Sequence, residues 1–417
     1  MGWLFRFFQK LMKEGNDKMK CLLQDMDILN KRVIVRCDFN VPLENGRILD
    51  DTKIKASLET INYLIEKNCK IILLSHMGKV KTIEDKKKYS LKVVAERLNE
   101  LVSSNVIFSP ETRSSFLEIK AMELQPKEIL LVENTRFEDI DNGFESNDDM
   151  QLASYFASLG DVFVLDAFAS AHRKHASTYG ITKFIPSCLG FLVQKEMDML
   201  NKYVLNAPKP FVIIMGGAKI DDKLALVEKL LPKCDHMLLA GGLANSALKS
   251  LGLNIGSSLA TNSEETLINV KKILSENSRK IILPFDAIVG NKYDDTLALS
   301  KDINKVSSDE VIGDVGPKTL GQYRKVLTGA KTIFMNGTLG MYEDKRYSNG
   351  TLELLNLLAD LPATKIAGGG DCTSAIDKFG YQDKFDFIST GGGATLEYIM
   401  NGTLPAIEAI NDAEEVL

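Results

Sequence analysis

Residues 211–223 have the sequence FVIIMGGAKIDDK, and this stretch decides the fold class. Its first five residues are apolar and rich in β-branched side chains, which is typical of a buried strand in a parallel sheet. Two glycines follow the strand, and a helix-like stretch follows them. Strand, glycine turn and helix in this order indicate an α/β fold with helical crossovers.

The same pattern recurs on both sides of this stretch. Further short apolar runs alternate with helix-like sequence at 33–35, 71–74, 129–132, 162–165, 237–240, 281–283, 332–335, 365–367 and 387–389. The runs fall into two groups along the chain. We therefore predict two Rossmann-like three-layer α/β/α domains with mainly parallel sheets, joined by an interdomain helix.

The boundary between the two groups lies near residue 200. Apolar side chains recur at helical spacing from Gly190 to Leu205, and Pro208 and Pro210 follow. The predicted segments are an N-terminal extension at 1–20, an N-terminal domain at 21–189, the interdomain helix at 190–206, a C-terminal domain at 207–400 and a C-terminal segment at 401–417.

Composition narrows the class of protein. Apolar residues make up 45% of the 417 residues and the net charge is −5, which does not indicate nucleic-acid binding. No apolar run approaches the roughly 20 residues of a membrane span. Six widely separated cysteines without a CxxC pair favour a reduced, cytoplasmic protein over a zinc site.

The first 20 residues form an unusual segment. Apolar residues lie on one helical face at Trp3, Leu4, Phe7, Phe8, Leu11 and Met12. Five basic residues accompany two acidic ones, which is typical of an amphipathic helix that contacts a membrane surface or a partner. A helix packed on the body of the protein and an upstream start codon, with Met19 as the true start, are the alternatives. Arg6 interrupts the apolar run and disfavours a secretory signal.

Polar and basic residues follow the strands of the first half. Since ligands of open α/β sheets bind at the carboxyl ends of strands, four strand ends are expected to bring His76, Lys79, Arg136 and Arg173 to one face. Converging cations bind phosphate and carboxylate, and arginine does so with a bidentate fork. The alternative for any one of these residues is solvated surface charge.

Glycines follow the strands of the second half, at 216–217, 241–242, 368–370 and 391–393. Glycine after a strand lets backbone N–H groups approach a phosphate at the start of the next helix. With Lys219 and Lys223 nearby, the loops predict a nucleotide site, although a single such loop can serve packing alone. Neither GxGxxG, GxxxxGK[ST] nor the protein-kinase motifs occur, which disfavours a nicotinamide-dependent dehydrogenase.

Three further residues or pairs have two interpretations each. Asp371 either caps a helix or holds the Mg²⁺ of a nucleotide. Glu343 either accepts hydrogen bonds from a ribose or is a surface acid. His172 and His175 have the spacing of a metal pair, but the cations Arg173 and Lys174 between them oppose a metal.

Together these motifs resemble the phosphoglycerate kinase family from about Arg32 to Glu408. They are DFNVP at 38–42, SHMGK at 75–79, ENTRF at 133–137, DAFASAHRKHAS at 166–177, GGAKIDDK at 216–223, NGTLGMYE at 336–343, GGGDC at 368–372 and STGGGATLE at 389–397. The resemblance implies reversible phosphoryl transfer between 1,3-bisphosphoglycerate with ADP and 3-phosphoglycerate with ATP, in glycolysis. It also implies Mg²⁺ as cofactor, a C-terminal segment that returns to the N-terminal domain, and a cytoplasmic monomer.

The resemblance also assigns site residues by position. Those implied to bind the acid are Asp38, Asn40, Lys53, His76, Lys79, Arg136 and Arg173. Those implied to bind the nucleotide are Gly217, Lys223, Gly241, Gly242, Glu343, Gly369, Gly370, Asp371, Cys372 and Gly392. Lys53 and Lys219 are implied to act at the transferred phosphoryl group, and Asp371 to ligate the metal.

The chain departs from the family at several positions. Lys53 and Lys79 stand where the family has arginine, and Thr338 and Cys372 also differ from the family pattern. Lysine keeps the charge but loses the planar fork. A catalytically weak, nucleotide-binding paralogue that serves as a scaffold or regulator is therefore the alternative function.

Overall fold

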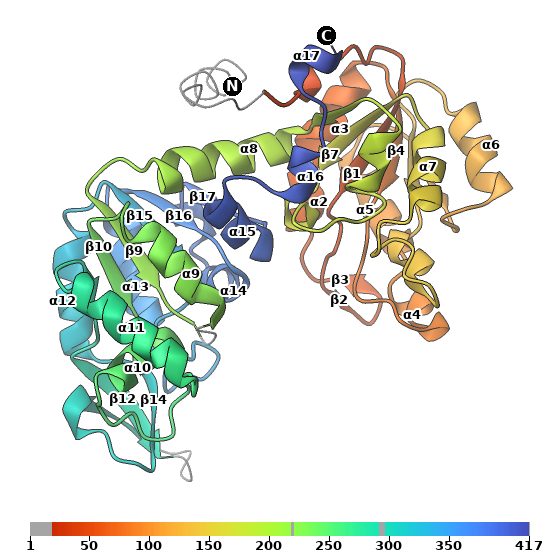
Figure 1. Ribbon diagram of the computed structural model, residues 1–417. Coiled ribbons are helices and arrows are strands. Elements are labelled where there is room, and N and C mark those ends of the chain that lie inside the picture. Colours follow the sequence, from red (N-terminus) through yellow and green to blue (C-terminus); the bar gives the residue numbers. More distant parts are fainter. Residues whose placement is uncertain (1–18, 218–220, 292–296, 417) are drawn as a thin grey trace. The chain divides into compact units, whose positions relative to one another are not determined.

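The computed structural model describes residues 19–217, 221–291 and 297–416 (Figure 1). The chain divides into two compact units. Unit 1 comprises residues 1–198 and 401–417, and unit 2 comprises residues 199–400. None of the helices within the described ranges is long and apolar enough to cross a membrane. Residues 1–18, and with them almost all of the predicted amphipathic extension, lie outside the described part.

Unit 1 is built on a six-stranded sheet in the order β5-β6-β4-β1-β7-β8. The strands are β1 Arg32–Cys37, β4 Lys70–Leu74, β5 Val106–Ser109, β6 Ile129–Val132, β7 Val162–Asp166 and β8 Ser187–Leu189. Every neighbouring pair is parallel. A separate short hairpin joins β2 Leu43–Glu44 to β3 Arg47–Ile48. The central strands are buried on both faces, which explains their uninterrupted apolar sequence.

Helices connect these strands. They are α2 Thr52–Ala56, α3 Leu58–Glu66, α4 Ile83–Lys88, α5 Lys92–Leu101, α6 Ser115–Glu123 and α7 Met150–Ser158, with 3₁₀ turns at Leu23–Asp25, Thr135–Asp139, Phe168–Ser170 and Gly180–Lys183. Helices α3 and α5 pack their apolar residues onto the sheet around Val35, Ile71 and Leu131. Side-chain caps begin α6, at Ser114, and α7, at Asp149.

The C-terminal segment belongs to unit 1. It contains α16 Pro405–Glu408 and α17 Ala413–Val416. The backbone N–H of Cys21 donates to the carbonyl of Asn411 over 2.9 Å, and the Lys20 ammonium lies 2.9 Å from the Asp412 carboxylate. The first described residues are therefore held by the last ones.

Unit 2 contains a second six-stranded parallel sheet, in the order β11-β10-β9-β15-β16-β17. Its strands are β9 Phe211–Met215, β10 His236–Leu239, β11 Ile281–Ile282, β15 Thr332–Asn336, β16 Thr364–Ala367 and β17 Phe387–Ile388. The helices are α9 Asp221–Leu230, α10 Gly241–Ser250, α11 Glu264–Glu276, α12 Pro317–Leu327, α13 Asn349–Asp360, α14 Gly370–Phe379 and α15 Gly393–Asn401, with 3₁₀ turns at Ile303–Lys305 and Gln382–Lys384. The two parallel sheets confirm the predicted fold class.

Unit 2 also carries a smaller antiparallel sheet that the sequence patterns did not predict. It consists of β12 Asp286–Asn291, β13 Ala298–Asp302 and β14 Glu310–Val315, in the order β13-β12-β14. Strands β5 and β8 of unit 1 were also missed. Each apolar run identified in the sequence overlaps a strand of one of the two parallel sheets.

The helix between the two groups of strands is α8, Phe191–Leu200, which continues as a π-helical turn at Asn201–Leu205. Its first turn is anchored in unit 1. The backbone N–H of Phe191 donates to the Thr60 hydroxyl over 3.0 Å, and that of Leu192 donates to the Asp166 carboxylate over 2.9 Å. The division between the units falls inside this helix, after Asp198.

Candidate active site

The carboxyl ends of β1, β4, β6 and β7 surround one polar cavity of about 250 Å³ in unit 1. All seven residues predicted to bind the acid line it, together with four others that were not predicted. The full lining is Asp38, Asn40, Lys53, His76, Gly78, Lys79, Arg136, Ala169, Ser170, Arg173 and His175. Six of these side chains are lysine, arginine or histidine, so the cavity is suited to an anion.

Short local contacts fix the acidic side of the cavity. The ammonium of Lys53 in α2 lies 2.8 Å from a carboxylate oxygen of Asp38. Burial alone would raise the pKa of Asp38, but the charge of Lys53 and the hydrogen bonds from Lys53 and the Asn40 N–H hold it below its ordinary value, so the carboxylate is ionised. The Asn40 side-chain oxygen accepts the backbone N–H of Gly78 over 2.8 Å, which joins the loop after β1 to the loop after β4.

Arginines form the cationic side. Burial, followed by the neighbouring charge of Arg173, lowers the pKa of Arg136. The Nε of Arg136 is buried and has no hydrogen-bond partner within the described residues. The Nε of Arg173 donates to the Nε2 of His172 over 3.0 Å. Two arginines held close together, one with an unsatisfied donor, indicate a site that is completed by an anion.

His175, which the sequence suggested only as half of a metal pair, lines the same cavity. It is nearly buried, and burial together with the charges of Arg36 and Arg136 lowers its pKa to about 3. The ring is therefore neutral at physiological pH. No cluster of His, Cys, Asp and Glu side chains within the described ranges has the geometry of a metal site.

Arg36 and Glu145 are charged residues of this region that sequence reasoning missed. Both are fully buried behind the cavity. Arg36 stands in β1 between Val35 and Cys37, two residues before the motif at 38–42 begins. A basic residue inside an apolar strand is a signal that could have revealed it, because a buried arginine requires partners.

In unit 2, glycine loops gather around the end of β9. The ammonium of Lys223, in α9, donates to the carbonyl of Gly216 and lies 3.4 Å from that of Asn336. A Cβ atom on Gly217 would lie 3.0 Å from the Lys223 ammonium and 3.8 Å from an Asp371 carboxylate oxygen. The backbone N–H of Gly242 donates to the Gly217 carbonyl over 2.9 Å. Gly217, Lys223, Gly242 and Asp371 thus belong to one site.

The loops after β15 and β16 lie beside the site that contains Gly217 and Lys223. Gly369 has a φ of 99° and directly precedes α14, so Gly370 and Asp371 lie in the first turn of that helix. The carboxylate of Asp371 is exposed, and the charges of Glu343 and Asp371 add to burial in raising the pKa of Tyr342 between them. The amino-terminal turn of a helix favours anions.

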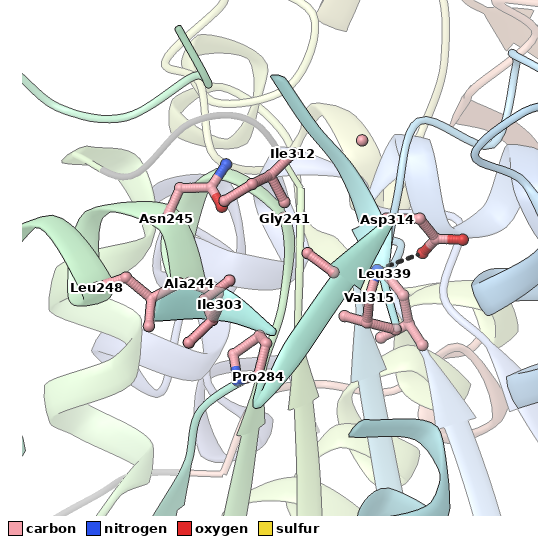
Figure 2. Close-up of a pocket in the computed structure, with 12 residues that line it drawn as sticks. Gly241, Ala244, Asn245, Leu248, Pro284, Ile303, Ile312, Asp314, Val315 and Leu339 are labelled. Atoms are coloured by element: carbon pink, nitrogen blue, oxygen red, sulfur yellow. Dashed lines mark hydrogen bonds between the residues drawn. The ribbon is translucent and has the colours of Figure 1, made fainter. Parts of the chain in front are cut away.

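A narrow pocket lies beside Gly241, between α10 and the antiparallel sheet (Figure 2). Its other lining residues are Ala244, Asn245, Leu248, Pro284, Ala287, Ile303, Ile312, Gly313, Asp314, Val315 and Leu339. The lining is mostly apolar, as Figure 2 shows, and its volume is about 20 Å³, roughly that of one water. A planar base would require its side chains to move.

Some predicted residues lie elsewhere or outside the described ranges. Lys219, the second predicted catalytic residue, is outside them. The Cys372 side chain is buried, and its thiol contacts the Met335 carbonyl at 3.5 Å, so only its backbone could face a ligand. Gly392, with a φ of 55°, lies after β17, and no described contact joins it to Lys223.

The donors near Asp371 can be tested against Mg²⁺. This ion is usually bound by one or two carboxylates together with substrate phosphates and water. One exposed carboxylate, beside an ammonium and a helix amino terminus, fits an ion that arrives with a phosphate. The set is too small for a metal held by the protein alone.

A cation-lined cavity in one α/β unit and a glycine-rich, helix-terminated loop site in another are the two parts expected of a phosphotransferase. Comparisons with known proteins identify which kind. The model of the family described as phosphoglycerate kinase matches residues 23–402.

Individual relatives agree with the family match. The phosphoglycerate kinase of Fusobacterium nucleatum is 43% identical over 399 residues, which cover 94% of this chain and all of the relative. That of Macrococcus caseolyticus is 45% identical over 397 residues, with the same coverage. The solved structure of the Coxiella burnetii phosphoglycerate kinase has a TM-score of 0.83 at 36% identity, covering 94% of this chain and 99% of the other.

The chain therefore belongs to the phosphoglycerate kinase family. Its activity is that of a phosphotransferase with a carboxyl group as acceptor, in glycolytic phosphoryl transfer. The family generally uses ATP together with Mg²⁺.

Proposed function

We propose that this chain binds 3-phosphoglycerate or 1,3-bisphosphoglycerate in the polar cavity of unit 1 and MgATP or MgADP at the glycine loops of unit 2. One observation carries the proposal. Seven residues chosen from the sequence, which come from five separate segments of the chain, line a single cavity of about 250 Å³.

In the acid site, we assign the cationic residues to the two negatively charged ends of the substrate. Arg136 has an unsatisfied Nε–H, and Arg173 is its close cationic neighbour. A phosphate or carboxylate would accept from such donors in the bidentate manner that suits arginine. Asp38 and Asn40 shape the site by holding Lys53 and Gly78.

In the nucleotide site, Lys223 and the backbone N–H groups at the start of α14 would bind phosphate oxygens. Asp371 would hold the Mg²⁺, which when bound neutralises charge on the phosphates. The pocket beside Gly241 is the candidate position for the base, and Glu343 the candidate partner of the ribose.

In catalysis, positioning and charge stabilisation are the main contributions of the protein, because phosphoryl transfer requires no covalent intermediate with it. Lys53 is assigned to the oxygens of the transferred group, where negative charge spreads in the transition state. Lys219 is assigned the same role from its place in the sequence. The ionised Asp38 orients the Lys53 ammonium and does not itself react.

The cellular setting is part of the proposal. All six cysteines are buried and free, which supports a reduced compartment such as the cytoplasm. We propose a monomer that acts on small molecules, without nucleic acid or membrane as a partner.

A coupled assay with ATP and 3-phosphoglycerate tests this function. We expect turnover that depends on both substrates and on Mg²⁺, and that falls about 10- to 100-fold in Arg136→Ala, since a lost charge-assisted contact costs roughly 1.5–3 kcal/mol. Nucleotide binding without turnover would contradict the enzyme and would instead identify a scaffold.

A further inference from the structure

A line of buried polar groups lies directly behind the acid cavity and is not explained by substrate contacts. It runs from Glu145 through Ser177 and Arg36 to His76. The side chains of Glu145, Ser177 and Arg36 are fully buried, and only His76 is partly exposed and lines the cavity.

Arg36 is held in one orientation by three different acceptors. Its Nε donates to the Ser177 hydroxyl over 2.8 Å, and its Nη1 donates to the Cys37 carbonyl. Its Nη2 lies 3.3 Å from the Nδ1 of His76. A guanidinium fixed on both edges cannot rotate without leaving buried donors unpaired.

Glu145 supplies the opposite charge. Its carboxylate accepts the backbone N–H of Ser177 over 3.0 Å and the hydroxyl of the same residue. The Thr135 hydroxyl donates to it over 3.2 Å. Burial lowers the pKa of Arg36, and the charge of Glu145 opposes that effect, so the carboxylate stabilises the charged guanidinium. The Ser177 hydroxyl joins the two, because it accepts from Arg36 and donates to Glu145.

The contact with Arg36 determines which nitrogen of His76 carries a proton. Arginine has no acceptor, so Nδ1 of His76 has to accept, and the proton of the neutral ring resides on Nε2. Burial and the Arg36 charge hold the pKa of His76 well below its ordinary value, which keeps the ring neutral. His76 therefore offers an N–H donor, and not a charge, to whatever occupies the cavity.

We propose that Glu145 is a positioning residue, which acts through Ser177 and Arg36 to fix the Nε2–H tautomer of His76 for binding the acid substrate. The inference rests on the proposed assignment of the unit 1 cavity to 3-phosphoglycerate. Glu145 itself does not line that cavity within the described structure.

The test uses Glu145→Gln and Ser177→Ala in the full chain. Ser109→Ala is the matched control, because Ser109 is a fully buried serine of the same unit whose hydroxyl donates to the Glu111 carbonyl, remote from this line of groups. The tautomer of His76 is read by ¹⁵N NMR of labelled protein without substrate. The chain has four histidines, so assignment by a His76→Gln variant is practical.

We expect a single Nε2–H tautomer in the wild type and in Ser109→Ala, and a mixture of tautomers in Glu145→Gln and Ser177→Ala. The KM for 3-phosphoglycerate should rise about 10-fold in both variants, with kcat within about twofold and the KM for ATP unchanged. Urea unfolding should show that both serine variants remain folded under the assay conditions, with the larger loss of stability in Ser177→Ala because the buried Nε–H of Arg36 loses its acceptor there.

The proposal is overturned if His76 keeps one Nε2–H tautomer in Ser177→Ala, or if the KM of that variant equals that of Ser109→Ala. Ser177→Ala decides the matter even if Glu145→Gln does not fold. The tautomer is measured without substrate, so an unchanged tautomer contradicts only the role of Glu145. A wild type that does not turn over would contradict the proposed function instead.

Discussion

Replacing Lys53 by arginine should make the enzyme faster. Lys53 lies in the short helix α2 with its side chain 30% exposed, and its ammonium contacts Asp38 at 2.8 Å. One of its N–H groups is thus committed to a carboxylate that is itself 7% exposed. An arginine could keep that contact with one edge of its fork and offer the other edge to the transferred phosphoryl group.

The size of the gain follows from what lysine already supplies. A new hydrogen bond to a charged group is worth roughly 1.5–3 kcal/mol. Lysine already provides the positive charge, so we expect the low end, about 1.5 kcal/mol, which is about 10-fold in rate. The gain should appear in kcat, because the charge on the phosphoryl oxygens spreads only in the transition state.

Full kinetics on Lys53→Arg, Lys79→Arg and the double variant measure the effect. Lys55→Arg is the matched control, since Lys55 lies in the same helix but pairs with Asp51 at 2.9 Å and does not line the cavity. Lys79 lines the cavity and should contact bound substrate in ground and transition states alike, so its replacement should lower KM instead. If kcat of Lys53→Arg is unchanged or lower, the site has adapted to lysine and the argument from lost geometry is wrong.

Further predictions concern nucleotide binding, the N-terminus and pH. Asp371→Ala and Lys223→Ala should each weaken MgADP binding by about 10-fold or more, measured by calorimetry, and wild type that binds no ADP at millimolar concentration would contradict the nucleotide site. Removing residues 1–18 should leave kcat and both KM values unchanged, since the family match begins at residue 23, and a truncated chain that does not fold would place this segment in the core. Burial raises the pKa of Asp166 from 3.8 to about 7, so its contribution to stability is present below pH 4 and is lost as pH rises through 7. The free energy of unfolding of Asp166→Asn, measured with urea, should therefore fall less between pH 5 and pH 8 than that of wild type. Equal decreases would contradict the raised pKa of Asp166.

The parallel sheets were predictable because their strands are buried on both faces. Such strands leave an uninterrupted apolar run in the sequence, as at β9. The antiparallel sheet was missed because β13, with the sequence ALSKD, has no buried residue and carries no apolar run. Strand β5 has only four residues and lies at a sheet edge, where burial is partial.

Four basic residues of the acid cavity, His76, Lys79, Arg136 and Arg173, were accessible from sequence because they follow strands, whereas Lys53, in helix α2, was assigned only through the family resemblance. The buried residues that hold this lining in place were not accessible from sequence. Arg36, Glu145 and Ser177 are far apart in the sequence and become partners only when the fold brings strand β1 together with the loops after β6 and β7. No local pattern distinguishes Glu145 from a surface carboxylate, since its meaning depends on a buried arginine more than 100 residues away.

The glycines of unit 2 had two interpretations in the sequence, close approach of a phosphate or tight packing, and the structure adds a third. At Gly217 and Gly337, with φ of 94° and 92°, an added Cβ would lie 3.0 Å and 2.8 Å from the Lys223 ammonium. The absence of side chains there makes room for a lysine that donates to main-chain carbonyls of its own loop. Burial lowers the pKa of Lys223, so its charge is costly until an anion compensates it. Glycine, lysine and phosphate are therefore coupled: the glycines admit the ammonium, and the ammonium in turn favours a bound phosphate.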